Sequence, residues 1–409
     1  MRILYLAHRI PYPPNKGEKT RSFHQIEFLS ARHIIDLFCF ADSDKEAEGK
    51  VALQSFCRNV HVETLHPREG YLRASAGLFT DMPASIAYYR SASMYEAVQR
   101  ALLKEAYDLI FVYCSSMAQF VPRPAPIPTV VDFVDADSSK WKQYAKHSSF
   151  PKSWLYEREG RTLSQYEKDV ADTCTLSLVT TPQEVFDLGG GVCQAVEVIE
   201  NGVTAPNLEA TQTPPVEIRA LQPYAVFVGT MNYRPNVDAV IHFAEEILPL
   251  LRQSHSHLRF LIVGRDPAPG VRRLARLPGV IVTGSVPDVH RYVAGAEVVV
   301  APFRIAQGVQ NKVLEALVAG IPVVLTSRPA RAIGSEARET LLVADTPIEF
   351  ANAVRSVLDN PEVRRRSREA APKLKDMLTW TTSLHRLEDL LGTAVARQRE
   401  SRLVDANHT

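Results

Sequence analysis

The sequence has little cysteine, no long apolar run and no excess of either charge. Its five cysteines are scattered through 409 residues without a Cys-x-x-Cys pair, which argues against a disulfide scaffold or a structural zinc site. The longest apolar runs, such as residues 109–113, fall far short of the ~18 residues that a membrane span needs. Lys and Arg total 47 against 46 for Asp and Glu, so no net field attracts nucleic acid. The apolar stretch at residues 3–7 is too short for a signal peptide, so we expect a soluble, cytoplasmic, multidomain protein.

Short apolar runs alternate with longer amphipathic ones along almost the whole chain. The predicted strands are 3–7, 34–40, 60–64, 109–113, 129–134, 176–181 and 196–199, followed by 225–229, 260–264, 280–284, 298–302, 323–326 and 341–344. Continuous apolar strands separated by helices indicate parallel strands that are buried on both faces. We therefore expect an α/β fold of two Rossmann-like, doubly wound parallel-sheet domains facing a cleft, where such sheets bind ligands.

A change in composition separates the two series of predicted strands. Residues 204–223 contain four prolines and no periodic apolar face, which is typical of a linker. The predicted organisation is an acceptor-side domain at 1–205, a linker at 206–222, a donor-binding domain at 223–378, and a C-terminal helix and tail at 379–409. In this last segment apolar residues recur every three or four positions, which predicts a closing helix that runs back towards the first domain. These residues are Leu384, Leu387, Leu391 and Val395.

The segment 298–324 reads as a strand, a glycine-containing loop, a helix, a glycine and a second strand. Gly308 lies where the loop becomes the helix, so free backbone N–H groups and the positive end of the helix dipole face the predicted cleft. Lys312 lies one turn further in, and Glu315 shares its face. This pattern suits a ligand whose diphosphate meets the lysine and whose ribose hydroxyls meet the carboxylate. The alternative is an ordinary Lys–Glu surface pair at i,i+3 spacing.

In this segment the chain resembles the family-4 glycosyltransferases, which have the GT-B fold of two Rossmann-like domains. Their donor helix carries Gly-x-x-x-Lys-x-x-Glu-Ala-x-x-x-Gly-x-Pro-Val-Val, matched here by Gly308, Lys312, Glu315, Ala316, Gly320, Pro322, Val323 and Val324. The resemblance implies that Lys312 and the amides at Gly308 bind the nucleotide diphosphate and that Glu315 binds the ribose. Many members have a glutamate where this chain has Gln307, which keeps the reach to the sugar but loses the charge.

The segment 227–239 resembles the first loop of the donor domain in that family. The resemblance implies that the amides of Gly229 and Thr230 approach the phosphates and that Arg234 supplies a positive charge beside them. In many relatives an Arg and a Lys follow this loop, whereas this chain offers only Arg234 nearby. The structural alternative is a strand-to-helix turn in which Asn236 caps the helix.

The loop after the first predicted strand contains Lys16, Gly17 and Arg21. Members of the family carry a proline- and glycine-containing loop here that lines the acceptor side, so the two cations are predicted to face an anionic acceptor. Solvated charges at the start of a helix are the alternative. The segment is not the G-x-G-x-x-G fingerprint, which disfavours NAD at this end.

Carboxylates follow the strand predicted at 129–134. Asp135-x-Asp137 imitates a metal-binding DxD, but about one such pair is expected by chance, and we predict no metal. In family-4 members this strand often ends in His-Asp, with the histidine near the donor sugar. Here Val134 replaces the histidine and Asp135 keeps the acid. Asp135 is therefore assigned a sugar-contacting, catalytic role, with N-capping of the next helix as the alternative.

Three motifs lie at 9–17 (Arg-Ile-Pro-Tyr-Pro-Pro-Asn-Lys-Gly), 132–141 (Asp-Phe-Val-Asp-Ala-Asp-Ser-Ser-Lys-Trp) and 308–315 (Gly-Val-Gln-Asn-Lys-Val-Leu-Glu). Together they resemble one subgroup, the glycosyltransferases associated with PEP-CTERM/exosortase exopolysaccharide systems. The resemblance implies a retaining, metal-independent transfer from a nucleoside diphosphate sugar to a glycan or polyprenyl-linked acceptor, with Lys312 and Asp135 as catalytic residues and no cofactor beyond the donor. Basic and aromatic residues alternate over 140–158, a composition that suits peripheral contact with an anionic membrane, here the inner face of the plasma membrane. A helix that packs these aromatics into the core is the alternative.

Three other functions stay open. A sugar-nucleotide epimerase of the same fold would change the sugar without an acceptor. A nucleotide-sugar-binding pseudoenzyme is favoured by Gln307 and Val134. A bilobed solute-binding protein is disfavoured by the lack of an export signal.

Overall fold

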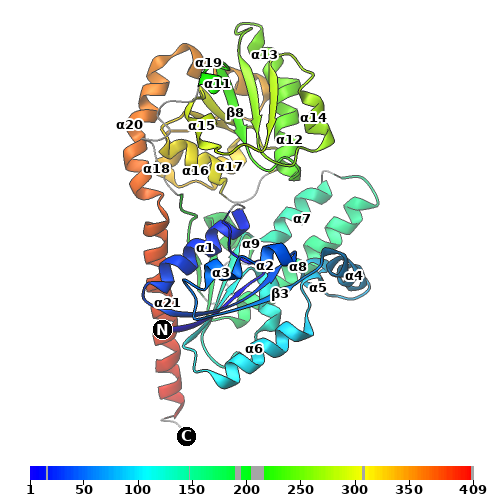
Figure 1. The fold of residues 1–409 in the computed structure, drawn as a ribbon, viewed down its shortest axis with the longest axis vertical. Helices are drawn as coiled ribbons and strands as arrows, with labels where there is room; N and C mark the ends of the chain where they lie inside the picture. The colour runs from blue at the N-terminus through cyan, green and yellow to red at the C-terminus, as the bar shows by residue number, and fades with distance from the viewer. Residues whose placement is uncertain (15–16, 147, 189–194, 204–215, 306–308, 407–409) are drawn as a thin grey trace. The chain divides into compact units, whose positions relative to one another are not determined.

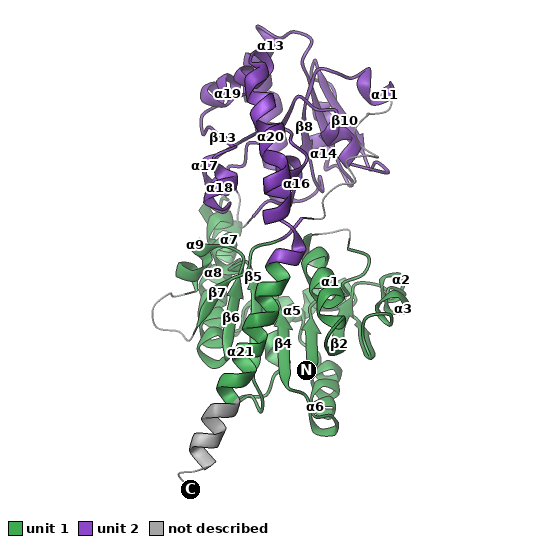
Figure 2. Ribbon diagram, turned by 90° about the vertical axis from the view of Figure 1, so that its left-hand side faces the viewer, with its two compact units in different colours: residues 1–201, 383–409 green, residues 202–382 purple. Residues whose placement is uncertain are grey.

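The computed structural model describes residues 1–14, 17–146, 148–188, 195–203, 216–305 and 309–406 (Figure 1). The chain divides into two compact units (Figure 2). Unit 1 comprises Met1–Asn201 and Ser383–Thr409, and unit 2 comprises Gly202–Thr382. Most of the predicted linker lies outside the described residues.

Unit 1 is built on a seven-stranded parallel sheet with the order β3-β2-β1-β4-β5-β6-β7. Its strands are β1 (Arg2–Ala7), β2 (Ile34–Ala41), β3 (Asn59–Thr64), β4 (Leu109–Tyr113), β5 (Thr129–Val134), β6 (Leu176–Val179) and β7 (Val196–Val198). All seven predicted strands are confirmed. They could be recognised in the sequence because parallel strands that are covered on both faces are continuous apolar runs. The sixth ends two residues early, since Thr181 begins a capping box for the next helix.

The helices of unit 1 flank the sheet, and all but the last, which returns from unit 2 at Ser383, lie between successive strands (Figure 1). They are α1 (Gly17–Ser30), α2 (Asp44–Ala47), α3 (Lys50–Leu53), α4 (Pro67–Gly77), α5 (Ala84–Tyr88), α6 (Ala92–Lys104), the 3-10 helix η1 (Ser115–Phe120), α7 (Asp137–Lys146), α8 (Lys152–Thr173), α9 (Pro182–Asp187) and α21 (Trp380–Ala406). Among the described residues no helix is both long enough and apolar enough to cross a bilayer.

The predicted apolar stripe of α21 is buried: Leu384, Leu387 and Leu391 are at most 2% exposed. Polar contacts add to this packing within unit 1. Glu388 accepts hydrogen bonds from Arg32 at 2.8 and 2.6 Å and lies 2.8 Å from the Nε2 atom of His33. The last helix therefore completes the unit that the first strand begins.

Unit 2 contains a six-stranded parallel sheet with the order β10-β9-β8-β11-β12-β13. Its strands are β8 (Tyr224–Val228), β9 (Arg259–Val263), β10 (Val280–Gly284), β11 (Val298–Ala301), β12 (Val323–Leu325) and β13 (Leu342–Val343). These confirm the six predicted for this half. The two sheets and their parallel order confirm the α/β fold of two Rossmann-like domains.

The helices of unit 2 are α11 (Val216–Arg219), α12 (Arg234–His242), the π-helix η2 (Phe243–Ile247), α13 (Leu248–Arg252), α14 (Pro269–Leu274), α15 (His290–Ala294), α16 (Asn311–Val318), α17 (Ser327–Arg331), α18 (Ser335–Arg338), α19 (Pro347–Asp359) and α20 (Pro361–Met377). The sequence pattern predicts one helix over 237–251, and the structure inserts a π turn there. Pro249 has no N–H to donate to the preceding turn, and a wider turn accommodates that missing hydrogen bond.

Candidate functional site

The side chain of Lys312 lies at the carboxyl end of β8 in unit 2. Lys312 is the second residue of α16, closer to the start of the helix than the sequence suggested. Its Nζ donates to the Oδ1 atom of Asn236 at 2.9 Å and lies over the rings of Phe227 and Phe303, at 4.2 and 5.0 Å from their centroids. Among the described residues Lys312 forms no ion pair within 4 Å, so it is not the Lys–Glu surface pair considered as the alternative. The ammonium is held by an amide and two aromatic faces.

This setting makes the charge of Lys312 costly. Burial lowers the pKa of Lys312 to about 7, although Glu315 raises it in part. The cation–π contacts and a single amide oxygen only weakly offset the free energy that the ammonium loses when it is removed from water. An anion arriving at this lysine would supply the missing countercharge, and the start of α16 adds the positive end of a helix dipole.

Asn236 joins the loop after β8 to the lysine. Its Nδ2 donates to the backbone oxygen of Thr230 at 2.9 Å, while its Oδ1 accepts from Lys312. The alternative in which Asn236 caps α12 is wrong, because that helix begins at Arg234 with Tyr233 as its N-cap. Asn236 is a residue that the sequence analysis did not assign to the site. No motif marked it, since its role depends on a partner 76 positions away.

Glycines let the backbone pack closely at this end of the sheet. A Cβ atom on Gly229 would lie 2.7 Å from Asn236 Nδ2 and 2.9 Å from Lys312 Nζ. Gly264, which follows β9, has φ +152°, and a Cβ there would lie 1.7 Å from the backbone oxygen of Gly229. The structure thus brings Gly229, Thr230 and Lys312 together as the sequence predicts, and Gly264 makes their arrangement possible.

Two arginines border the same loop. Arg234, the predicted cation, is half-buried at the first position of α12. Arg265 is half-buried directly after Gly264, and its backbone oxygen accepts a hydrogen bond from Met231 at 2.9 Å. The sequence motifs did not mark Arg265, because the second positive charge beside the phosphates was expected only in the loop after the first strand of unit 2. An arginine directly after the predicted strand at 260–264 is the signal that could have found it.

Glu315 is half-buried on α16, one turn after Lys312. Burial raises the pKa of Glu315, while His290 at the start of α15 and Lys312 lower it. Glu315 and His290 are therefore neighbours. Gln307, Gly308 and Lys16, which the sequence analysis also assigned to ligand contacts, lie outside the described residues.

Arg21 does not occupy the position that the sequence suggested. Its side chain is in the core of unit 1, with 1% of its surface exposed. Its Nε donates to Asp132 at 2.8 Å, and its Nη1 donates to Asn201 at 2.9 Å. Gln25 donates to the same Asp132 oxygen at 2.7 Å. This corrects the prediction of a cation offered to an acceptor: the buried carboxylate of Asp132 takes the charge instead. Gly17, the other described residue of that prediction, begins α1.

Asp135 follows a strained residue at the carboxyl end of β5. Val134 has φ +65°, a conformation that a β-branched residue rarely adopts. The N–H of Val134 donates to the Asp132 side chain at 3.0 Å, and its carbonyl accepts from Thr180 at 3.0 Å. Because α7 begins at Asp137, Asp135 is not its N-cap. The constrained turn fixes the direction of Asp135, whose pKa is raised by burial and by the charge of Asp137.

Segment 140–158 divides its aromatic residues between two environments. Trp141, Tyr144 and Tyr156 pack on one another with ring centroids 5.4–5.8 Å apart. Phe150 and Trp154, by contrast, are 82% and 58% exposed. Tyr144 is thus buried as the core-packing alternative expects, Trp141 and Tyr156 are half-buried beside it, and two aromatic side chains remain on the surface.

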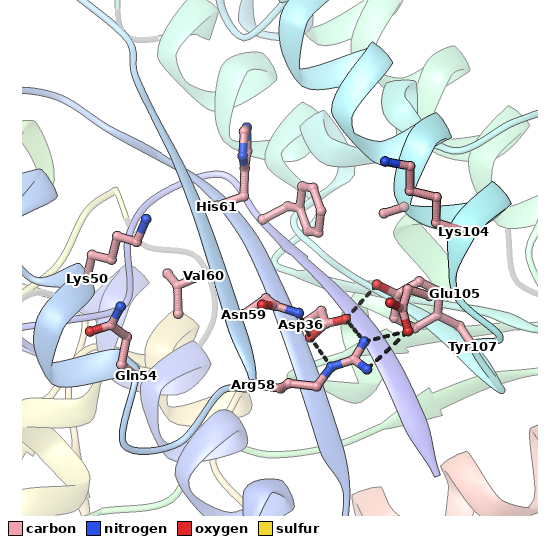
Figure 3. A pocket seen from close by; sticks show the side chains of 12 residues that line it. Asp36, Lys50, Gln54, Arg58, Asn59, Val60, His61, Lys104, Glu105 and Tyr107 are labelled. Atoms are coloured by element: carbon pink, nitrogen blue, oxygen red, sulfur yellow. Dashed lines mark hydrogen bonds and ion pairs between the residues drawn. The ribbon is translucent and has the colours of Figure 1, made fainter.

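A pocket of about 410 Å³ lies at the amino ends of β2 and β3 (Figure 3). Asp36 in its floor accepts hydrogen bonds from Arg58 at 3.0 Å and Tyr107 at 2.6 Å, and Arg58 also donates to Glu105 at 3.0 Å. Burial raises the pKa of Asp36, but these hydrogen bonds together lower it. The charges at the floor are mutually satisfied, and open α/β sheets bind ligands at the opposite, carboxyl edge. We interpret this pocket as a structural ion-pair network.

Comparisons with known proteins agree with the geometry of unit 2. Residues 222–360 match the protein family described as Glycosyl transferases group 1. No curated protein sequence matches the chain. Solved structures match over both units: sucrose-phosphate synthase from Thermosynechococcus elongatus has 16% sequence identity and a TM-score of 0.69, covering 97% of this chain and 100% of its own.

HepE of Anabaena, in complex with UDP and glucose, has 17% identity and a TM-score of 0.65, with 96% and 99% of the two chains covered. WaaG, a glycosyltransferase involved in lipopolysaccharide biosynthesis, has 16% identity and a TM-score of 0.65, with 95% and 99% covered. The chain therefore has the two-domain GT-B fold. The family match adds a glycosyltransferase group 1 domain in unit 2, and together they support a GT-B glycosyltransferase.

Proposed function

We propose that this protein transfers a sugar from a nucleoside diphosphate donor to a growing, lipid-linked exopolysaccharide, as the family-4 subgroup of PEP-CTERM systems does. The observation that carries the proposal is the Lys312 ammonium, held by Asn236 against Gly229 in the segment that matches the glycosyltransferase family. The complexes of the neighbour HepE with UDP and UDP-glucose support a nucleotide sugar as the donor.

In the reaction the bond between the anomeric carbon and the diphosphate breaks, and the acceptor oxygen forms the new bond to that carbon. Negative charge accumulates on the departing diphosphate. Lys312 and the first amides of α16 stabilise this charge, and Arg234 and Arg265 add further positive charge. The acceptor attacks from the face that the diphosphate leaves, so the anomeric configuration is retained. The proton of its hydroxyl goes to the leaving phosphate, so the transfer needs no separate strong base, and the cationic groups that stabilise the diphosphate take the place of a metal ion.

The other polar residues take binding roles in this proposal. The amides of Gly229 and Thr230 approach the phosphates, Glu315 accepts from the ribose hydroxyls, and Gln307 and Gly308 contact the donor from the loop before α16. Asp135 contacts the transferred sugar. Lys16 and Gly17 line the acceptor side.

We further propose that the protein works at the inner face of the plasma membrane. Phe150 and Trp154 are the exposed aromatic residues of segment 140–158, and Lys146 and Lys152 are exposed beside them. Aromatic rings flanked by lysines suit the interface of an anionic bilayer, where a polyprenyl-linked acceptor resides. Sedimentation with vesicles of phosphatidylglycerol should therefore weaken in a F150S/W154S variant.

The test of the function is incubation of the purified protein with labelled nucleotide sugars and a membrane extract. Transfer of label to lipid, with the donor's anomeric configuration in the product, supports the proposal. A free epimer of the sugar would indicate an epimerase, and saturable binding without turnover would indicate a pseudoenzyme. A K312A variant is the control for transfer by a contaminant.

A further inference from the structure

Two helices of the chain start with the same four-residue pattern in opposite surroundings. Residues 181–184 and 346–349 both read Thr-Pro-x-Glu, and both form a capping box. The glutamate of each accepts from the backbone N–H of its threonine, at 2.9 Å for Glu184 and 3.1 Å for Glu349. Glu349 is exposed, whereas Glu184 is 1% exposed. The exposed Glu349 therefore serves as a control for the buried Glu184.

Thr180 connects Glu184 to Asp135. The Oγ1 atom of Thr180 lies 3.1 Å from Glu184 Oε2 and 3.2 Å from Asp135 Oδ1. A hydroxyl carries one proton, so it can satisfy only one of the two carboxyl groups. Glu184 Oε2 already accepts from the N–H groups of Thr180 and Thr181. The hydroxyl proton is therefore best placed on Asp135.

Among the described residues, the second oxygen of Glu184 lacks the hydrogen-bond donor that an ionised carboxylate would need. Oε1 is buried and has no hydrogen-bond partner among the described residues. Two neighbouring carboxylates with one hydroxyl between them repel each other, and a buried pair relieves this by keeping one proton. Glu184 is the more buried of the two, because Asp135 is partly exposed. The proton belongs on Glu184.

We propose that Glu184 is a positioning residue, a neutral carboxylic acid that acts with Thr180 to orient the Asp135 carboxylate for sugar transfer. The inference rests on the proposed role of Asp135. Burial raises the pKa of Glu184 to about 9, and the charge of Asp135 adds to the shift. Hydrogen bonds with Thr346 instead lower the pKa of Glu349.

Charged groups on α7 also act on the pair. Asp137 raises the pKa of Asp135, and Lys140 lowers it. On α9, Asp187 accepts a hydrogen bond from Ser139 at 2.9 Å. None of these contacts donates to Glu184 Oε1 among the described residues.

The first test compares the melting temperatures of full-length wild type, E184Q and E349Q from pH 5 to 9. Folded Glu184 keeps a proton that the unfolded chain releases above its ordinary pKa of about 4.3. Wild type should therefore lose stability relative to E184Q as the pH rises. E349Q should melt below wild type by a similar amount at every pH in this range, because Glu349 is ionised throughout it. A fall of E184Q relative to wild type with rising pH would overturn the proposal.

The second test incubates the protein with a membrane extract, which supplies the acceptor, and with saturating UDP-glucose, UDP-N-acetylglucosamine and GDP-mannose, and measures release of nucleoside diphosphate. At saturating donor, where the bound diphosphate keeps Lys312 charged, the wild-type rate should fall about tenfold per pH unit above the titration of Glu184, and E184Q should lack this fall. T180V should lose more than tenfold, and T180S should restore the rate. Unchanged release by T180V would overturn the positioning role. If wild type released nothing while the melting pattern held, the neutral Glu184 would be supported and the proposed function contradicted.

Discussion

The side-chain oxygen of Asn236 accepts a hydrogen bond from the ammonium of Lys312 at 2.9 Å, across 76 positions of sequence. The same amide donates to the oxygen of Thr230. Asn236 thus fixes the lysine relative to the loop after β8. Because this hydrogen bond involves a charged group, we expect it to contribute about 1.5 kcal/mol to the free energy of ligand binding at this site.

Replacing Asn236 by alanine should therefore weaken UDP binding roughly tenfold. Without the Asn236 amide, the Lys312 ammonium is no longer held beside the loop after β8. Isothermal titration of wild type and N236A with UDP measures the effect, and far-UV circular dichroism checks the fold. Equal affinities for UDP would show that Asn236 does not hold Lys312 for the ligand.

Replacing Lys312 by alanine should lower turnover about a hundredfold, because removing one group that stabilises developing charge costs about 3 kcal/mol. The variant should keep its fold, since a costly buried charge is removed. Rates are measured with saturating donor. A rate near that of wild type would exclude Lys312 from the charge stabilisation.

UDP binding should weaken as the pH rises above 7. Lys312 has a pKa of about 7 without ligand, and a bound diphosphate raises it, so binding takes up a proton at neutral and higher pH. The affinity should fall by up to about tenfold per pH unit. K312R, which stays charged, is the matched control and should bind UDP with little dependence on pH. A flat wild-type profile from pH 6 to 9 would contradict this.

Replacing Gly264 by alanine should destabilise unit 2 by about 2 kcal/mol or more, because its Cβ would meet the Gly229 oxygen at 1.7 Å and its φ is +152°. Gly270 on α14 is the control, since the nearest atom to a Cβ there, Cδ1 of Ile241, would be 3.5 Å away. G270A should be neutral or slightly stabilising. Thermal unfolding distinguishes the two variants, and similar melting temperatures would disprove the packing argument.

Replacing Arg21 by methionine should destabilise unit 1 by about 3–5 kcal/mol, because Asp132 is fully buried and would lose its ionic partner. The double variant R21M/D132N should recover part of this loss. Urea denaturation measures both variants. A stable single variant would mean that the hydrogen bonds from Gln25 and the Val134 N–H suffice for the carboxylate.

The sequence predicted the strands well and the buried polar contacts poorly. The strands could be found because each is a continuous apolar run between helices. Lys312 and Gly229 could be placed by local motifs. Arg21 could not, because an arginine at the start of a helix is usually solvated and its partner Asp132 is 111 positions away. Glu184 and Glu349 have the same local pattern, so only tertiary structure separates the buried one from the exposed one.

The return of the chain to unit 1 at Ser383 has a consequence for biosynthesis. When residues 1–201 have left the ribosome, the partner of Arg32 and His33, Glu388, has not yet been translated. Leu387, which is fully buried in the folded unit, is also missing while all of unit 2 is made. Translation of α21, rather than emergence of the first sheet, is therefore the event that lets unit 1 close.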